Sequence, residues 1–167
     1  MRAEQFCTFF VDGLFFGVVV KTVQEVIRSQ AATAVPLASS NVGGLINLRG
    51  QIVTAINLRH RLGLSAFRKD ELPMNVVVRA GGSVFSLLVD EIGDVVDVTE
   101  ADFEAPPDTL RGPARDLIDG TYKLSGHLML VLNTERAVAI GADSQIENVL
   151  SSKLDLFRPP SLAASSS

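Results

Sequence analysis

Apolar residues fall in short runs along the chain. Several of these runs occur in pairs, and two residues ending in glycine separate the two runs of each pair. "QFCTFFV" and "LFFGVVV" flank Asp12-Gly13, and "NVVVRA" and "SVFSLLV" flank Gly81-Gly82. Arg49-Gly50 and Ser125-Gly126 divide two further pairs of apolar runs. Apolar runs on both sides of a two-residue turn predict β-hairpins. Because the hairpins recur at short spacing and are rich in Val, Ile, Phe and Leu, an all-β fold of small barrels is expected.

Two segments of the chain recur without gaps. Residues 13–27 align with 82–96, and residues 44–64 align with 120–140. This order predicts an internal duplication and a pair of similar small domains. The copies need not pair in chain order, because the N- and C-terminal strands can complete one barrel while the middle of the chain forms the other.

One position of the repeat differs in a way that bears on function. Arg49 aligns with Ser125 at the same hairpin turn. Since the second copy forms the turn with serine, the fold does not need an arginine at this position. Arg49 is therefore expected to serve a contact rather than folding.

Helices are expected at two places. Residues 21–28, "KTVQEVIR", fit either a helical turn or a bent strand, and the pattern does not decide between them. Residues 143–158 have a capping box, Ser144 and Glu147, and place Ile146, Val149, Leu150, Leu154 and Phe157 on one helical face. This helix can pack on its own barrel or dock a partner. Pro159-Pro160 end it, and residues 159–167 are expected to be a disordered tail.

Composition and charge narrow the class of protein. The chain has 167 residues, 47% of them hydrophobic, which suits one domain or two very small ones sharing a core. A net charge of −4 argues against nucleic acid or an anionic membrane as a partner. The one cysteine, Cys7, excludes a disulfide framework and is expected to be a buried strand thiol. Neither a leader peptide nor a membrane-spanning apolar run is recognisable, so a soluble cytoplasmic protein is expected.

Residues that carry catalysis are scarce. The chain has two histidines, His60 and His127, and with one cysteine these are a poor supply for a zinc site. No phosphate-binding glycine loop or G-x-S-x-G motif is present. The acidic group Asp90, Glu91 and Asp94 is read as a solvated turn, and the basic group Arg59, His60, Arg61, Arg68 and Lys69 as a solvated loop. We expect no catalysis, no metal site and no cofactor.

The motifs "VQEVI" (23–27), "GLINLRGQIVTAINLR" (44–59), "LLVDEIGDVVDVT" (87–99) and "HLMLVLNTERAV" (127–138) closely resemble those of CheW, the bacterial chemotaxis coupling protein family. The resemblance runs from about Gln5 to Ile140. It implies two small five-stranded SH3-like β-barrels, packed around a shared hydrophobic core with a few short helices. It assigns residues 1–142 to a CheW-like domain of two intertwined barrels.

The resemblance also implies a scaffold role. The protein looks like an adaptor between the cytoplasmic tips of methyl-accepting chemoreceptors and the regulatory domain of the histidine kinase CheA, without catalysis. Such a protein is cytoplasmic, lies at receptor arrays beneath the inner membrane and meets the membrane only through receptors. The expected receptor-binding residues, in a groove between the barrels, are Val23, Glu25, Val26, Arg49 and Val89. The kinase-contact residues are not assigned.

One strand departs from the family pattern. Family members usually carry "PIVDLR" where this chain has Thr54, Ala55, Ile56 and Asn57 before Leu58-Arg59. The departure keeps open a coupling protein of a divergent chemosensory system that controls surface motility or development. Two less favoured alternatives remain. One is a small enzyme that uses Cys7, or His60 with the Asp cluster, and the other is a detached regulatory domain of a kinase.

Overall fold

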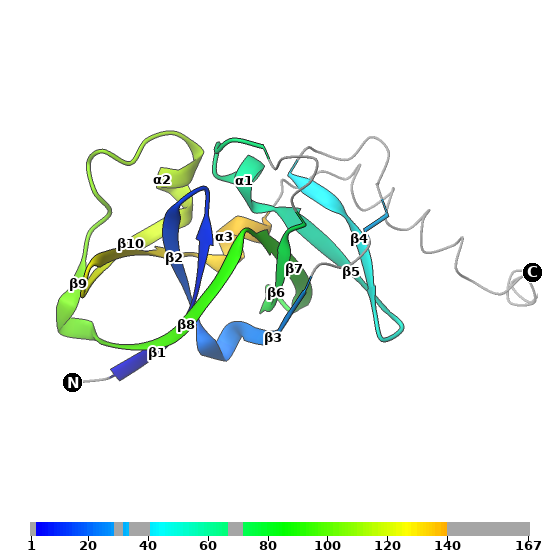
Figure 1. Ribbon diagram of the computed structural model, residues 1–167, viewed down its shortest axis with the longest axis horizontal. Coiled ribbons are helices and arrows are strands. Elements are labelled where there is room, and N and C mark those ends of the chain that lie inside the picture. The colour runs from blue at the N-terminus through cyan, green and yellow to red at the C-terminus, as the bar shows by residue number, and fades with distance from the viewer. Residues whose placement is uncertain (1–2, 29–31, 34–40, 67–71, 140–167) are drawn as a thin grey trace, which may run out of the picture.

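The structure is a computed structural model that describes residues 3–28, 32–33, 41–66 and 72–139 (Figure 1). Two β-sheets and a few short helices make up this part of the chain, which confirms the predicted all-β class. No helix in these ranges is long and apolar enough to cross a membrane. The helix expected at 143–158 and the tail expected at 159–167 lie outside the described residues.

The first sheet has six strands in the order β8-β1-β2-β11-β10-β9. It combines strands from the N-terminal and C-terminal parts of the chain, and η2 (Glu100–Asp102) links its two end strands, β8 and β9. The strands are β1 (Ala3–Val11), β2 (Leu14–Val19), β8 (Glu91–Thr99), β9 (Phe103–Glu104), β10 (Ile118–Leu124) and β11 (His127–Leu132). This sheet has one strand more than the five expected. The additional strand is the two-residue β9, since Phe103 and Glu104 pair with the edge of β10.

The second sheet has five strands in the order β3-β6-β7-β5-β4. Thr33, which follows β3, exchanges two backbone hydrogen bonds of 2.8 Å with Leu45 of β4, so the two ends of the sheet approach each other. The strands are β3 (Val23–Ile27), β4 (Val42–Leu48), β5 (Gln51–Asn57), β6 (Met74–Ala80) and β7 (Ser83–Val89). The remaining helices are η1 (Val20–Thr22), α1 (Leu58–Arg61), α2 (Pro113–Leu117) and α3 (Thr134–Val138).

The strand pairing follows the internal duplication. In the first sheet β2 runs parallel to β11 with Phe16 opposite Leu130, and in the second β7 runs parallel to β5 with Phe85 opposite Thr54. Phe16 aligns with Phe85 in the sequence repeat, and Thr54 aligns with Leu130. Each early copy thus pairs with the other half's late copy, and the chain crosses between the sheets after β2 and again after β7.

The local predictions can be compared with this arrangement. All four predicted hairpins are present, and Asp12, Gly13, Gly81 and Gly82 adopt the positive φ that such turns need. For residues 21–28 the sequence left a helical turn and a bent strand open. The structure has the 3₁₀ turn η1 there, followed by strand β3.

Most side chains expected in the core are buried. Phe16, Ile46, Ile56, Leu88 and Leu130 have 9% exposure or less. Phe10 and Phe85, also expected there, are half-buried. The main cluster joins residues of both sheets with residues of α1, α2 and α3, so the two sheets share one core. A smaller cluster, which includes Phe6, Tyr122 and Met129, lies within the first sheet.

Cys7 is a buried thiol, as the sequence predicted. Burial raises the pKa of the Cys7 thiol, because the thiolate would lose its hydration inside the sheet. We therefore expect Cys7 to react with Ellman's reagent at pH 8 at least about a hundred times more slowly than in urea-unfolded protein. Absorbance recorded against time measures the reaction rates of the folded and the unfolded protein. Equal rates would show that Cys7 is accessible in the folded chain.

Candidate functional site

The candidate site lies where the β4–β5 hairpin turn meets strand β3. Arg49 at the turn donates from Nη2 to Oε2 of Glu25 at 2.8 Å, and its Nη1 lies 3.4 Å from Oε1. The Arg49 side chain is 80% exposed, whereas that of Glu25 is 20% exposed. Glu25 therefore holds one edge of the guanidinium in place, while the rest of the arginine faces solvent.

The backbone of Arg49 is strained. Its φ is 51°, and among the described non-glycine residues only Asp12 shares a positive φ. Ser125, which aligns with Arg49 in the repeat, does not adopt it. A left-handed conformation costs a bulky residue about 1 kcal/mol or more, and asparagine or glycine would fit better at this turn. The arginine is thus retained against a local conformational preference, which agrees with a role in contact.

Replacing Arg49 with asparagine is expected to leave the free energy of unfolding within about 1 kcal/mol of the wild-type value, or to raise it. Asparagine tolerates the left-handed turn, and the exposed ion pair that is lost contributes at most about 1 kcal/mol. Arg49→Ala, which lacks this tolerance, is expected to be about 0.5–1 kcal/mol less stable than Arg49→Asn. Urea unfolding followed by circular dichroism measures both. A loss above about 2 kcal/mol in Arg49→Asn would make Arg49 a folding residue.

The three valines expected at the site have different environments. Val26 is 38% exposed. Val23 is half-buried and packs against the shared core. Val89 has 0% exposure, so the expectation that it supplies apolar area to a binding groove is wrong. Val89 ends a central strand of the second sheet and faces the interior. The sequence does not reveal this, because a continuous apolar run does not show which of its side chains are buried.

Strand β3 also divides the expected residues between its faces. A register shift between Val23 and Glu25 marks a bulge at Gln24, and pairing is regular from Glu25 to Ile27. Successive side chains in a regular strand point to opposite faces. Glu25 and Val26 therefore do not form one flat patch, and Val26 lies on the face opposite the ion pair.

A second charged constellation was missed in the sequence. Arg59 is buried, with its side chain 10% exposed, and its Nε donates to Asp90 Oδ1 at 2.9 Å. Arg59 Nη1 donates to the carbonyl of Ser65 at 2.9 Å, and the Asp12 backbone N–H donates to Asp90 Oδ2 at 2.7 Å. We call Arg59, Asp90 and Asp12 the crossover junction, because Asp90 sits where the chain passes from β7 to β8.

The crossover junction corrects two readings of the sequence. Asp90 was expected in a solvated acidic turn and Arg59 in a solvated loop. Instead, both side chains are largely buried and form an ion pair with each other. The parallel pairing of β5 with β7 brings Arg59 and Asp90 together. Asn57 of β5 is opposite Leu88 of β7, and Arg59 and Asp90 each come two residues after this pair. The sequence alone does not give that register.

The departure from the family pattern at 54–57 falls mainly inside the protein. Ala55 and Ile56 have 0% exposure. The Asn57 side chain caps α1 by accepting from the His60 N–H, and Asn133, its equivalent in the repeat, caps α3 in the same way. Asparagine and aspartate cap helices about equally well. The changed strand thus gives no reason to expect an altered partner surface.

Residues considered for catalysis are not assembled with one another. His60 Nδ1 lies 2.7 Å from Asn41 Oδ1, and His127 lies against the rings of Phe10 and Phe15. In the part of the chain that the structure describes, no group of three or more His, Cys, Asp or Glu residues could hold a metal ion.

Comparison with known proteins places the chain in a family. The sequence model of the family described as "CheW-like domain" matches residues 5–140. A chemotaxis protein CheW of Treponema pallidum is 26% identical over 136 residues, covering 79% of this chain and 80% of its own. One of Rhizobium meliloti is 28% identical over 120 residues, covering 72% and 77%. The scaffolding protein TtCheW from Thermoanaerobacter tengcongensis superposes with a TM-score of 0.76 at 22% identity, covering 85% of this chain and 97% of that one.

The chain therefore belongs to the CheW-like domain family. The relatives named above are chemotaxis proteins, and the structurally similar chain is a scaffolding protein.

Proposed function

We propose that this protein couples the cytoplasmic tips of methyl-accepting chemoreceptors to the regulatory domain of the histidine kinase CheA. It acts by binding alone, without catalysis, in the cytoplasm at receptor arrays beneath the inner membrane. The observation that carries the proposal is Arg49, an 80% exposed arginine on a strained turn, oriented by a carboxylate.

Arg49 and Glu25 have separate roles in the proposal. Two guanidinium nitrogens of Arg49 face Glu25, and its remaining N–H donors make no hydrogen bond within the described residues. These donors suit carboxylate or carbonyl oxygens on a receptor helix. Glu25 is a positioning residue, because it fixes the plane of the guanidinium and lowers the conformational entropy lost on binding.

The valines contribute unequally. Val26, which is 38% exposed, offers apolar area to a partner that wraps around the edge strand β3. Val23 and Val89 are assigned an indirect role, because their side chains pack into the core from β3 and β7. A helical hairpin that reaches both faces of β3 would contact Val26 on one face and Arg49 on the other.

The domain organisation is part of the same proposal. Residues 1–142 form one CheW-like domain in which the second sheet is one barrel subdomain and the first sheet the other. The sheet order and the shared core support this division. The helix at 143–158 and the tail at 159–167 stay predictions.

The experiment is affinity capture from native cell lysate, with wild type, Arg49→Asn and Arg79→Asn as bait and mass spectrometry as readout. Arg79 is an exposed arginine on β6 and serves as the matched control. We expect wild type and Arg79→Asn to recover a chemoreceptor and a CheA-type kinase, and Arg49→Asn to recover the kinase alone. If no bait recovers either partner, the coupling function is wrong. If all three recover the receptor equally, the function holds and the assignment of Arg49 is wrong.

A further inference from the structure

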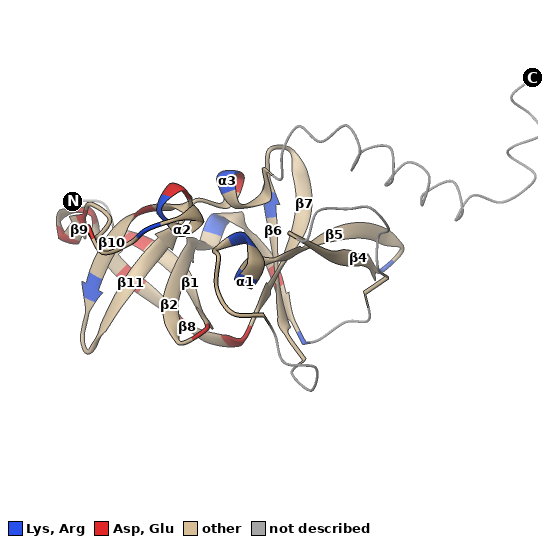
Figure 2. Cartoon of the chain, turned by 90° about the horizontal axis from the view of Figure 1, so that it is seen from above, with Lys and Arg blue, Asp and Glu red and all other residues tan. Residues whose placement is uncertain are grey.

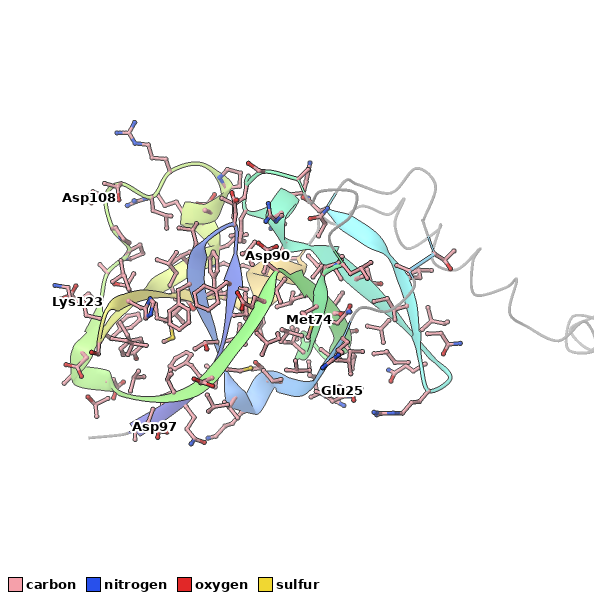
Figure 3. All side chains as sticks on the ribbon, in the orientation of Figure 1. Glu25, Met74, Asp90, Asp97, Asp108 and Lys123 are labelled. Atoms are coloured by element: carbon pink, nitrogen blue, oxygen red, sulfur yellow. The ribbon has the colours of Figure 1, made fainter. Side chains whose placement is uncertain are left out.

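A cavity of about 270 Å³ opens at the end of the first sheet, away from the candidate site. It lies between the start of β1, the end of β8, η2 and the end of β10, and Figure 3 labels Asp97 and Lys123 at this end of the molecule. Ala3, Asp97, Val98, Thr99, Asp102, Tyr122, Lys123 and Leu124 line it. Its volume is near the lower limit of about 300 Å³ for small-molecule sites, so it suits a group the size of one side chain.

Carboxylates dominate the polar part of the cavity wall. Asp97 and Asp102 both line it, and Thr99 donates a 2.9 Å hydrogen bond to Oδ2 of Asp102. The cation in the wall, Lys123, has its Nζ 3.7 Å from Oε1 of Glu104 on β9. Figure 2 shows acidic segments at β9 and beside the N-terminal end of the chain. The cavity thus has more negative charge than the lysine balances.

Tyr122 provides an independent sign of a ligand. It is 6% exposed, and its ring packs between Phe6 and Phe103 with centroid distances of 5.6 and 5.2 Å. Within the described residues its hydroxyl makes no hydrogen bond, and no buried side-chain oxygen lacks a partner, so the hydroxyl oxygen is accessible on a residue that lines the cavity. Burial, followed by the charges of Glu100, Glu4 and Asp102, raises the pKa of Tyr122, so the hydroxyl stays neutral at physiological pH.

The hairpin turn beside the cavity differs from its duplicate in charge. In the second sheet, Arg49 at the hairpin turn supplies a guanidinium to the acidic residue on β3. In the first sheet the equivalent turn carries Ser125, which has no charge to offer. Asp94, which aligns with Glu25 in the repeat, does not line the cavity, so the cavity is not the counterpart of the Arg49–Glu25 pair, and the one cation in its described wall is Lys123.

We propose that this cavity binds the cationic head of an alkylguanidinium or alkylammonium compound. Asp97 and Asp102 supply opposite charge, and the neutral Tyr122 hydroxyl accepts a hydrogen bond from one N–H. Val98 and Leu124 contact the alkyl stem. A basic side chain of a partner protein and a free guanidino or amino compound share this chemistry. The inference does not depend on the proposed receptor contact, because the cavity and Arg49 lie on different sheets.

The test is a titration of the full-length, ¹⁵N-labelled protein with ethylguanidinium, followed by NMR. N-ethylurea, which has nearly the same shape and no charge, is the matched control ligand. We expect ethylguanidinium to shift the amide signals of Val98, Tyr122 and Leu124 with a Kd on the order of 1–10 mM, and ethylurea to leave them unchanged. Equal shifts with both ligands, or no shifts with ethylguanidinium at about 50 mM, would overturn the proposal.

Variants locate the binding groups. Asp97→Asn combined with Asp102→Asn is expected to weaken binding about three- to tenfold, and Tyr122→Phe about twofold or more. Asp108→Asn, an exposed aspartate in the loop at the opposite side of this end (Figure 3), is the matched control and is expected to bind like wild type. Unchanged affinity in the double variant would contradict the assignment.

A second titration separates the two sources of the cation. Binding of N-acetyl-arginine methylamide as tight as that of ethylguanidinium would support a protein side chain, because the peptide groups then fit outside the cavity. Binding of agmatine with exclusion of the peptide form would support a free compound. Failure of both, despite binding of ethylguanidinium, would overturn both sources and with them the proposal of a biological ligand.

Discussion

Replacing Arg59 with alanine is expected to lower the free energy of unfolding by about 3–5 kcal/mol, as removal of one partner from a buried ion pair commonly does. The Arg59 and Asp90 side chains are 10% and 22% exposed, so water compensates little for the lost partner. Arg59 also satisfies the Ser65 carbonyl and lies 3.5 Å from Asp12, so one truncation loosens three segments. Urea unfolding at pH 7 measures the loss.

Two further variants make this expectation specific. Arg79→Ala removes an exposed arginine from β6 and is expected to change stability by no more than about 0.5 kcal/mol. The double variant Arg59→Met with Asp90→Leu removes both charges of the buried pair, leaves only the more exposed Asp12 carboxylate without its partner, and is expected to recover part of the loss. If Arg59→Ala costs less than about 1 kcal/mol, the crossover junction does not stabilise the connection between the two sheets.

Phe16→Ala is expected to lower the free energy of unfolding by about 3–5 kcal/mol through the cavity it leaves. Phe16 is 1% exposed and stacks on Phe9 at a centroid distance of 5.8 Å. The cluster that contains it joins residues of both sheets, so the variant should unfold in one transition at lower urea concentration.

Leu14→Ala on the same strand serves as the control. Leu14 is 39% exposed, so its truncation is expected to cost less than about 1 kcal/mol. Hydrogen exchange measured on Phe16→Ala tests the shared core directly. Loss of protection in β2 with full protection kept in β6 and β7 would show that the sheets unfold separately.

The local elements could be predicted from the sequence because their causes are local. Asp12-Gly13 and Gly81-Gly82 supply the positive φ of two-residue turns, and the flanking apolar runs supply the strands. The residues around Val23 were ambiguous, because a bulge at Gln24 breaks the alternation that identifies a strand. Residues 103–104 gave no strand signal, since two residues are too few for a pattern.

Long-range pairing could be predicted in part. The repeat gave the equivalence of Phe16 with Phe85, and the structure places both on strands in parallel pairs. It could not give the register that brings Arg59 to Asp90, because that contact depends on two strand ends lying side by side. Val89 was expected to supply apolar area to a binding groove, while its burial depends on the position of β7 in the middle of the sheet.

The site could be predicted as far as its charged pair. The exchange of Arg49 for Ser125 between the copies indicated a residue that folding does not require. The strain at Arg49 and its two contacts with Glu25 were added by the structure.

The most direct test of the central claim, that Arg49 is present for partner contact and not for folding, is a calorimetric titration with a receptor hairpin-tip fragment. Wild type, Arg49→Asn and the control Arg79→Asn are compared at equal salt concentration. We expect Arg49→Asn to bind at least about tenfold more weakly than the other two proteins while melting no more than a few degrees lower. Equal affinities for all three proteins, or weaker binding accompanied by a matching loss of stability, would contradict it.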